Sequence, residues 1–180
     1  NRHINPTNIC VLSCKFCDFA KKPGDKDAYE MSIEQILDQM DEEISEVHIV
    51  GGHHPSWEFS HYVDMVKAIH DKYPNVQIKA FTASEIDYFY RRWKITPEES
   101  LSILKEAGLD SMPGGGAEVF SDRIHKMLLP GKATGDRWLD IHRIAHNMDI
   151  KSNCTLLYGH VETFEERVDH LIKLRNLQNE

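Results

Sequence analysis

The sequence has little positive charge and no long apolar run. Its 21 Lys and Arg residues are outnumbered by 29 Asp and Glu residues, which gives a formal net charge of −8. Because nucleic-acid phosphates bind to basic surfaces, this balance argues against a duplex nucleic-acid partner. No apolar stretch approaches the roughly 20 residues that cross a bilayer, and no signal peptide is visible. We therefore expect a cytoplasmic protein with no membrane span and no nucleic-acid partner.

Cysteine is scarce and unevenly placed. Of the four cysteines, Cys10, Cys14 and Cys17 fall close together, whereas Cys154 lies far away in an apolar segment. Thiols that are crowded in this way pair poorly with one another, so a disulfide framework is disfavoured. The clustering is more typical of an intracellular metal site. Free cysteine inside a strand commonly behaves as a small buried apolar residue, so we predict that Cys154 belongs to the core.

Internal repeats, low-complexity segments and linkers are also absent, so we interpret residues 1–180 as one domain. Because the chain begins at Asn1 and still has a helical pattern at Glu180, we expect it to be a fragment of a longer chain. Short apolar runs alternate with helix-like stretches, which is typical of a parallel sheet with helices outside. A complete eightfold barrel takes about 250 residues. The sequence therefore predicts an α/β fold, a partial or truncated TIM-like (βα) barrel.

The alternation also predicts individual elements. Five strands are expected, at His3–Ile9, Val47–Val50, Val76–Phe81, Leu109–Met112 and Ser152–Leu157. Capping residues predict helix starts at Ser32, Thr96 and Thr163. Amphipathic stretches predict helices through Tyr62–Ile69 and Trp138–Ala145. In such folds the chemistry lies at the carboxyl ends of the strands, which is where the motifs of this sequence fall.

The cysteine motif, Cys10-Val-Leu-Ser-Cys14-Lys-Phe-Cys17, directly follows the first predicted strand. Cysteines at such spacings bind one iron–sulfur cluster or one zinc ion. A structural zinc site takes four protein ligands, whereas a cluster held by three cysteines leaves one iron open. The lack of a fourth cysteine nearby favours the open cluster. The alternatives are a zinc knuckle completed by a distant residue such as His3, and a non-catalytic zinc or iron–sulfur module.

Glycines and polar side chains follow the second and third predicted strands. Gly51 and Gly52 allow a ligand to approach the backbone closely. His53 and His54 are either substrate ligands or acid–base groups, because imidazole titrates near neutrality, or else histidines of a solvent-facing loop. Glu85 is a candidate for binding ribose or substrate, with a helix-stabilising carboxylate as the alternative.

Two more glycine-rich segments follow the fourth and fifth predicted strands. Three consecutive glycines contribute little to stability, so we expect Gly115 to contact a ligand through its backbone. Glu118, two residues after this run, is a second candidate for ligand binding. Gly159 again permits close approach, and His160 is a candidate catalytic group at the mouth of the barrel.

Other polar side chains are expected at the surface. His142 and His146 lie one helical turn apart and are in principle able to bind zinc, but such residues on a surface helix are more often solvated. Arg91 and Arg92 also fall on a segment that we expect at the surface. None of these four residues is therefore assigned to the site.

The C-x3-C-x2-C spacing, with an aromatic residue before the last cysteine, resembles the signature of the radical S-adenosylmethionine (SAM) superfamily. Within that superfamily the chain looks like the aminofutalosine synthase family of menaquinone biosynthesis. The dehypoxanthine futalosine cyclases and the deazaflavin (F0) synthases share much of the pattern. Besides the cysteine motif, the resemblance is carried by Asn5-Pro-Thr-Asn8, Gly51-Gly-His-His-Pro55, Phe81-Thr-Ala-Ser-Glu85-Ile, Pro113-Gly-Gly-Gly-Ala-Glu118 and Tyr158-Gly-His-Val-Glu162.

This resemblance implies two cofactors and the residues that bind them. A [4Fe–4S] cluster would be held by the three clustered cysteines, and the methionine amine and carboxylate of SAM would bind its open iron. Phe16 would pack near the adenine, and Gly51 and Gly52 would accept hydrogen bonds from the amine. Glu118 would reach the ribose or the amine.

The resemblance also implies a reaction, that of a radical SAM transferase. A 5′-deoxyadenosyl radical would add to the enol-ether double bond of 3-[(1-carboxyvinyl)oxy]benzoate, and loss of the carboxyl group would give aminofutalosine. The partners would be this small aromatic enol ether and a reductant protein such as flavodoxin or ferredoxin. Family members are considerably longer, so an Arg that binds a substrate carboxylate is expected outside this chain. The catalytic candidates within it are His53, Glu85 and His160.

Overall fold

The computed structural model describes residues 1–180 and contains one parallel sheet of five strands in the order β1-β2-β3-β4-β5. The first and last strands do not pair with each other, so the sheet is open. This arrangement confirms the predicted α/β fold with a partial barrel. The strands are β1 (Arg2–Ile4), β2 (Glu46–Ile49), β3 (Gln77–Ala80), β4 (Ser111–Met112) and β5 (Lys151–Ser152).

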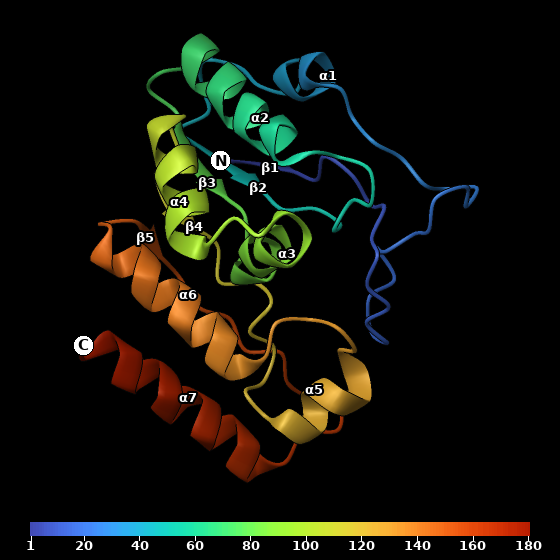
Figure 1. Cartoon of the computed structure of the whole chain (residues 1–180), viewed down its shortest axis with the longest axis vertical. Helices are drawn as coiled ribbons and strands as arrows, with labels where there is room; N and C mark the ends of the chain where they lie inside the picture. The colour runs from blue at the N-terminus through green and yellow to red at the C-terminus, as the bar shows by residue number, and fades with distance from the viewer.

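Helices follow each strand. Figure 1 shows α2, α4 and α6 in a row along one side of the sheet, with α7 beside α6. None of the helices combines the length and the apolar character that a membrane span requires. The helices are α1 (Ile33–Leu37), α2 (Phe59–Lys72), α3 (Ala83–Trp93), α4 (Pro97–Glu106), α5 (Asp122–Leu128), α6 (Gly135–Asn147) and α7 (Phe164–Gln178).

The core lies between the sheet and the helices. Val47, Ile49 and Ile78 are fully buried on the side of the sheet that the helices cover. Successive strand residues point to opposite faces, so the residues between them lie on the other face. There Glu46 forms an ion pair with Lys79 at 2.8 Å. Burial of each of the three aliphatic side chains stabilises the fold by about 1.5–3 kcal/mol, and the alternation fixes which face carries polar groups.

The strands at both ends of the sheet are shorter than predicted because the chain leaves the sheet early. The predicted strand His3–Ile9 contributes only its beginning to β1, and its last residue instead bridges Lys21 in the following loop. The fifth strand stops at Ser152, after which the Leu157 N–H donates to the Glu118 carbonyl at 3.0 Å. Because β1 and β5 end early, the loops that follow them form backbone contacts with other loops at the carboxyl edge of the sheet.

The predicted helix starts are confirmed. Ser32, Thr96 and Thr163 each form a capping box with a Gln or Glu three residues later. The amphipathic stretches lie within α2 and α6, as expected. Helices α3 and α5 are not predicted from the sequence, although α3 begins with the same device, in which Thr82 is capped against Glu85.

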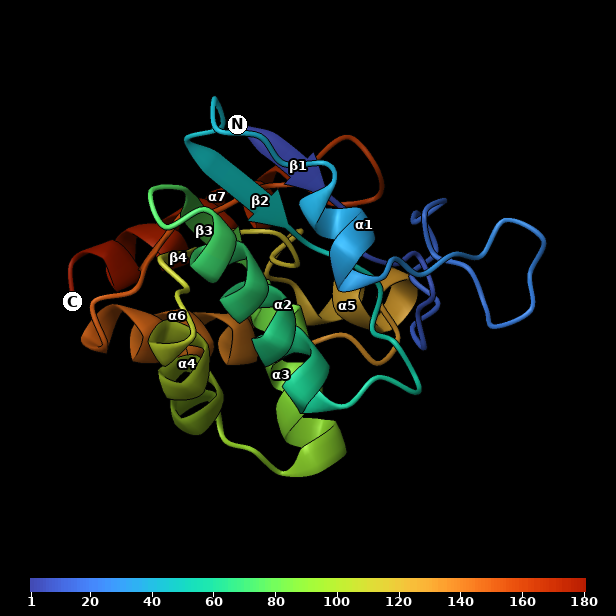
Figure 2. The same ribbon diagram turned by 90° about the horizontal axis from the view of Figure 1, so that it is seen from above.

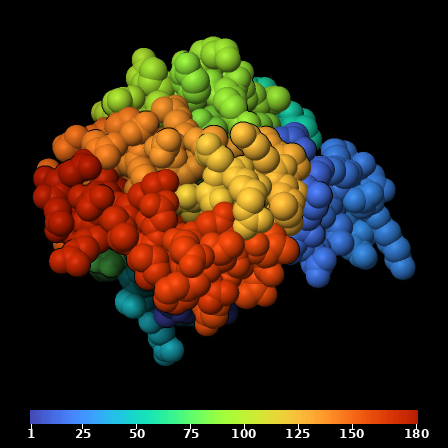
Figure 3. Space-filling model, turned by 90° about the horizontal axis from the view of Figure 1, so that it is seen from below, coloured from blue at the N-terminus to red at the C-terminus, as the bar shows by residue number.

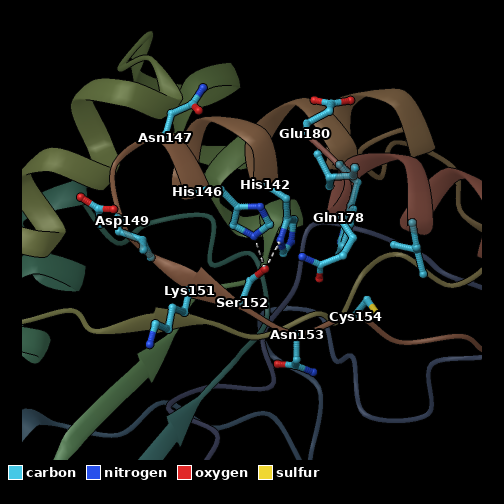
Figure 4. Close-up of a pocket in the computed structure, with 14 residues that line it drawn as sticks. His142, His146, Asn147, Asp149, Lys151, Ser152, Asn153, Cys154, Gln178 and Glu180 are labelled. Carbon is cyan, nitrogen blue, oxygen red and sulfur yellow. Dashed lines mark hydrogen bonds between the residues drawn. The ribbon is translucent and has the colours of Figure 1, made fainter.

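Two predictions about burial were wrong. Cys154 is exposed rather than part of the core, because β5 ends two residues before it. His142 is fully buried and stacks on Trp138 with ring centroids 3.6 Å apart, whereas His146 is exposed as expected. Burial lowers the pKa of His142 to about 3. Figure 4 shows both imidazoles pointing at Ser152, whose Oγ lies 2.8 Å from each, in a hollow of about 630 Å³ beside β5 and α7.

Candidate functional site

A cavity of about 210 Å³ lies at the carboxyl ends of the strands. Figure 2 shows β1 and β2 pointing toward this edge, where the segment after β1 and helix α5 lie. Parallel strands bring the loops that follow them to a common edge, so residues far apart in the sequence meet there. Nine of the residues predicted from the sequence line the cavity: Cys10, Cys14, Cys17, Phe16, Gly51, Gly52, His53, Glu85 and Glu118.

The cysteine loop (residues 10–17) is attached to two neighbouring segments. The Val11 N–H donates to the His53 carbonyl at 3.0 Å, and the His53 N–H donates in turn to the Cys10 Sγ at 3.3 Å. At the other end, the Lys15 N–H donates to the Leu128 carbonyl at 2.9 Å, and Figure 3 shows this part of the chain beside α5. The loop is therefore held from both sides with its thiols at one cavity.

The donor set suits an iron–sulfur cluster. All the cysteines are free, and three of them line the cavity as soft donors. A structural zinc site takes four protein ligands, whereas a cubane cluster that is held by three thiolates would keep one iron open. Three soft donors around one cavity fit such a group.

The environment of the thiols is partly apolar and partly charged. Burial raises the pKa of Cys14, and the ammonium group of Lys132 opposes this shift.

His3, the residue suggested for completing a zinc knuckle, is exposed and stacks on His48 with ring centroids 4.8 Å apart. It does not line the cavity. The protein therefore offers no fourth ligand at the place where the sequence suggested one.

Of the two glycines after β2, Gly52 is required by packing against the start of the cysteine loop. A Cβ on Gly52 would lie 2.1 Å from the Ile9 carbonyl oxygen and 3.1 Å from the Cys10 Cβ. A Cβ on Gly51 would meet the Thr7 carbonyl oxygen at 3.2 Å. The space beside Gly52 is thus filled by the start of the cysteine loop. Any side chain there would displace the segment that carries the first thiol.

Glu85 is buried and hydrogen-bonded on both oxygens. Its Oε2 accepts from the Thr82 N–H at 2.7 Å and from the Thr82 hydroxyl at 2.8 Å, while its Oε1 accepts from the Gly51 N–H at 3.2 Å. Burial raises the pKa of Glu85 to about 7, although these hydrogen bonds act in the opposite direction. The carboxyl group therefore caps α3 and ties it to the loop after β2, while it also lines the cavity.

His53 is an uncharged imidazole on the cavity wall. It stacks on Tyr88 with ring centroids 4.8 Å apart, and its Nε2 lies 3.4 Å from the Ser84 hydroxyl. Burial, with smaller effects from Lys132 and Arg91, lowers its pKa to about 3, so it does not titrate near neutrality. Its Nδ1 is buried and has no hydrogen-bond partner in the protein. His53 is therefore suited to hydrogen bonding rather than to acid–base chemistry at neutral pH.

His54 is also buried rather than solvent-facing, but it is directed elsewhere. Its Nε2 lies 2.9 Å from the Glu30 carboxylate, and its Nδ1 accepts from the Trp57 N–H at 3.1 Å. It does not line the cavity. These contacts organise the segment that leads from β2 into α2.

Lys132, which the sequence analysis missed, faces Glu118 across the cavity wall. The Lys132 Nζ lies 2.7 Å from the Glu118 carboxylate, and their side chains are only 13% and 15% exposed. Glu118 itself has a positive φ of 49°, a conformation that costs a non-glycine residue about 1–2 kcal/mol. Lys132 lies between two helices, α5 and α6, so the rule that functional residues follow the strands does not indicate it.

Three predicted residues lie outside the cavity. The Gly115 carbonyl accepts from the Trp138 indole at 3.2 Å, and it is the next residue, Gly116, that reaches the cavity. Gly159 is exposed, with nothing near its missing side chain. His160 lies 3.2 Å from the Glu162 carboxylate in the same loop. The loop that carries Gly159 and His160 is instead hydrogen-bonded to α5, where Arg123 donates to the Val161 carbonyl at 2.9 Å.

Comparisons with known proteins identify the family to which this chain is related. Residues 4–174 match the family model described as the Radical SAM superfamily. An aminodeoxyfutalosine synthase from Thermus thermophilus is 42% identical over 98% of this chain and 49% of its own length. A 5-amino-6-(D-ribitylamino)uracil–L-tyrosine 4-hydroxyphenyl transferase from Methanopyrus kandleri is 38% identical over 100% of this chain and 50% of its own length. The chain thus spans about half the length of these relatives.

A solved structure shares the fold at low sequence identity. It is the FeFe-hydrogenase maturase HydG from Carboxydothermus hydrogenoformans, with a TM-score of 0.70 and 14% identity. The match covers 99% of this chain and 41% of that chain. At this identity the likeness supports the arrangement of strands and helices alone.

Proposed function

The chain belongs to the radical SAM superfamily, and from this premise we propose that Cys10, Cys14 and Cys17 hold a [4Fe–4S] cluster whose open iron binds SAM. The observation that carries the proposal is that these three thiols line one cavity, while Cys154 does not. Three thiolates on a four-iron cluster leave one metal position for another molecule.

The other residues of the cavity suit the remaining parts of SAM. Phe16 is 40% exposed at the cavity and offers a ring face against which an adenine stacks. The backbone at Gly51 and Gly52 is within the wall and is proposed to accept hydrogen bonds from the methionine amine. Glu118 is proposed to bind the ribose. Gly115, Gly159 and His160 lie outside the cavity and have no part in this assignment.

We infer a reaction of the aminofutalosine synthase type. The support is the 42% identity to an aminodeoxyfutalosine synthase across almost the whole chain. When bound, the cluster and SAM supply an electron and the adenosyl group that joins the enol ether of 3-[(1-carboxyvinyl)oxy]benzoate. The residues of this chain bind and orient the reactants and exclude water. Among them, His53 offers an uncharged imidazole and Glu85 a carboxyl group that titrates near neutrality. A flavodoxin or ferredoxin is the proposed reductant.

The test is an anaerobic incubation of the full-length protein with iron, sulfide, SAM, dithionite and the enol-ether benzoate, followed by mass spectrometry. We expect a product that contains the adenosyl group. The Cys14→Ala variant should lose this product and the brown colour, while Cys154→Ala, at an exposed cysteine outside the cavity, should keep both. The same incubation with dehypoxanthine futalosine in place of the benzoate tests for a cyclase, which free 5′-deoxyadenosine together with a cyclised futalosine product would identify. Absence of SAM cleavage by the reconstituted protein would overturn the proposal.

A second candidate reaction is favoured by the 38% identical relative. That protein's name describes transfer of a 4-hydroxyphenyl group from tyrosine to 5-amino-6-(D-ribitylamino)uracil. The same incubation with these two compounds in place of the benzoate separates the candidates. We expect no coupled product from them, and its formation would favour the second candidate over the synthase.

A further inference from the structure

Lys132 is the one lysine or arginine among the residues that line the cavity. It pairs with Glu118 at 2.7 Å, and both side chains are largely withdrawn from water. Removal of one member of such a pair leaves an uncompensated charge, so the two groups depend on each other. The pair lies in the same cavity as the three clustered thiols, which themselves become anionic when they bind metal.

The chain around Lys132 places its side chain at this position. Lys132 closes a turn in which its N–H donates to the Leu129 carbonyl at 3.1 Å. The Gly131 carbonyl in this turn accepts from the Arg91 guanidinium at 2.5 Å, which anchors the turn to α3. Gly116 has a positive φ of 86°, and a Cβ there would come within 3.5 Å of the Lys132 Cε. The Lys132 side chain therefore packs beside the third glycine of the run, at ordinary van der Waals distance.

The backbone of Glu118 is also held in place by a contact within the protein. Its backbone is in the left-handed region, and its carbonyl accepts from the Leu157 N–H at 3.0 Å. Residues in such conformations persist only where their surroundings fix them, and they gather at binding sites. The hydrogen bond from Leu157 holds the Glu118 backbone, and the ion pair with Lys132 holds its carboxylate on the cavity wall.

We propose that Lys132 is a positioning residue that holds the Glu118 carboxylate in the cavity, where that carboxylate accepts hydrogen bonds from the hydroxyls of a nucleoside ribose. The proposal deepens the proposed function and rests on it, because the ribose is that of SAM. A carboxylate has acceptor sites for two hydroxyl donors at once. Without the lysine, the carboxylate would have no compensating charge inside the cavity and would turn toward water.

The test compares the binding of SAM with that of its analogue lacking both ribose hydroxyls, by equilibrium dialysis with the cluster-loaded full-length protein and no reductant. We expect wild type to prefer SAM by about 10- to 100-fold, as for hydrogen bonds to a charged group. Lys132→Met should lose this preference, and Lys132→Arg should restore most of it. Glu118→Gln should lose it too, and the double variant should be no worse than Glu118→Gln, because the two residues act as one unit.

The matched control is Lys79→Met. Lys79 forms a partly buried pair with Glu46 at 2.8 Å, outside the cavity, so its loss should leave the preference unchanged. An unchanged preference in Lys132→Met would overturn the proposal, as would a loss of iron from that variant that accounts for weaker binding. If Lys132→Met does not fold, the contrast between Lys132→Arg and Glu118→Gln decides. Failure of the wild-type protein to bind SAM would overturn the proposed function instead, and the two failures are therefore distinguishable.

Discussion

At the scale of the residue, burial determines what each polar group of the cavity is able to do. His53 and Glu85 both lie on the wall, and each is about 95% buried. Burial disfavours the charged form of each, so the histidine stays neutral and the carboxyl group retains its proton to about pH 7. The sequence identified both residues, but their roles depend on neighbours that are remote in sequence, such as Gly51.

The buried carboxyl group of Glu85 predicts a pH-dependent stability. Its pKa rises from 4.5 to about 7 in the folded protein, so the folded state keeps a proton that the unfolded state releases. The resulting contribution is fully present below pH 4.5 and is lost as the pH rises to about 7, on the order of 3 kcal/mol in total. Urea unfolding of wild type and Glu85→Gln between pH 5 and pH 8 should show wild type losing stability relative to the variant.

Glu99 provides a matched control for this measurement. It occupies the same capping position in α4 but is exposed, and hydrogen bonds from Thr96 lower its pKa. The difference in the free energy of unfolding between wild type and Glu99→Gln should therefore not fall as the pH rises through 7. If the difference in the free energy of unfolding between wild type and Glu85→Gln stays constant with pH, the raised pKa of Glu85 in the folded protein is contradicted.

At Gly52, the addition of a single methyl group is expected to have a steric effect. In Gly52→Ala the new Cβ would lie 2.1 Å from the Ile9 carbonyl oxygen, so the cysteine loop must move. Such overpacking costs about 1–3 kcal/mol, and we expect the variant also to bind less iron. Gly51→Ala, whose nearest contact is 3.2 Å, should be milder in both respects. Urea unfolding and iron content measure the two effects, and equal behaviour of the two variants would refute the packing argument.

At the scale of the element, local signals were readable from the sequence and long-range ones were not. The capping boxes at Ser32, Thr96 and Thr163 each involve residues three apart, so the sequence displays them in full. Thr82 begins α3 by the same device, directly after Phe81, where the third strand is predicted to end. The early end of β5 depends on contacts of residues 153–157 with the loop after β4, which no local pattern reveals.

The segment after the cysteine loop acts as its support and carries a prediction. The Lys22 Nζ donates to the Cys10 carbonyl at 2.9 Å and to the Leu12 carbonyl at 2.6 Å. Loss of groups that orient metal ligands typically weakens metal binding by about 10- to 100-fold. We therefore expect Lys22→Met to lose iron to a chelator faster than wild type, with Lys22→Arg between them. Lys26→Met, in the same exposed segment, should match wild type, and equal rates in all four proteins would contradict this role.

At the scale of the whole molecule, the cavity joins five segments that are distant in sequence. The cysteine loop, the segments after β2, β3 and β4 and the connection between α5 and α6 each contribute to its wall. The sequence predicts where the first four meet, because parallel strands end at one edge. Lys132 is not indicated by the sequence, since no strand precedes that residue, and Gly159 and His160, which the sequence predicts at the cavity, do not line it.

Because the cavity couples these loops, bound SAM should stabilise the whole fold, but only after the cluster is in place. A ligand at 100 times its Kd adds about 2.7 kcal/mol to the stability of the state that binds it. We expect SAM to raise the Tm of the cluster-loaded protein and to leave that of the metal-free protein unchanged. Cys14→Ala should abolish the effect and Cys154→Ala should preserve it. An equal rise in the metal-free protein would mean that SAM binds without the open iron.

The most direct test of the central claim is electron paramagnetic resonance of the anaerobically reconstituted and reduced protein, recorded before and after SAM is added. Three cysteine ligands and one open iron predict the signal of a reduced [4Fe–4S] cluster that changes when SAM is added. A protein that instead contains zinc, or a cluster whose signal SAM leaves unchanged, would contradict the assignment of Cys10, Cys14 and Cys17 as the three ligands of an open cluster.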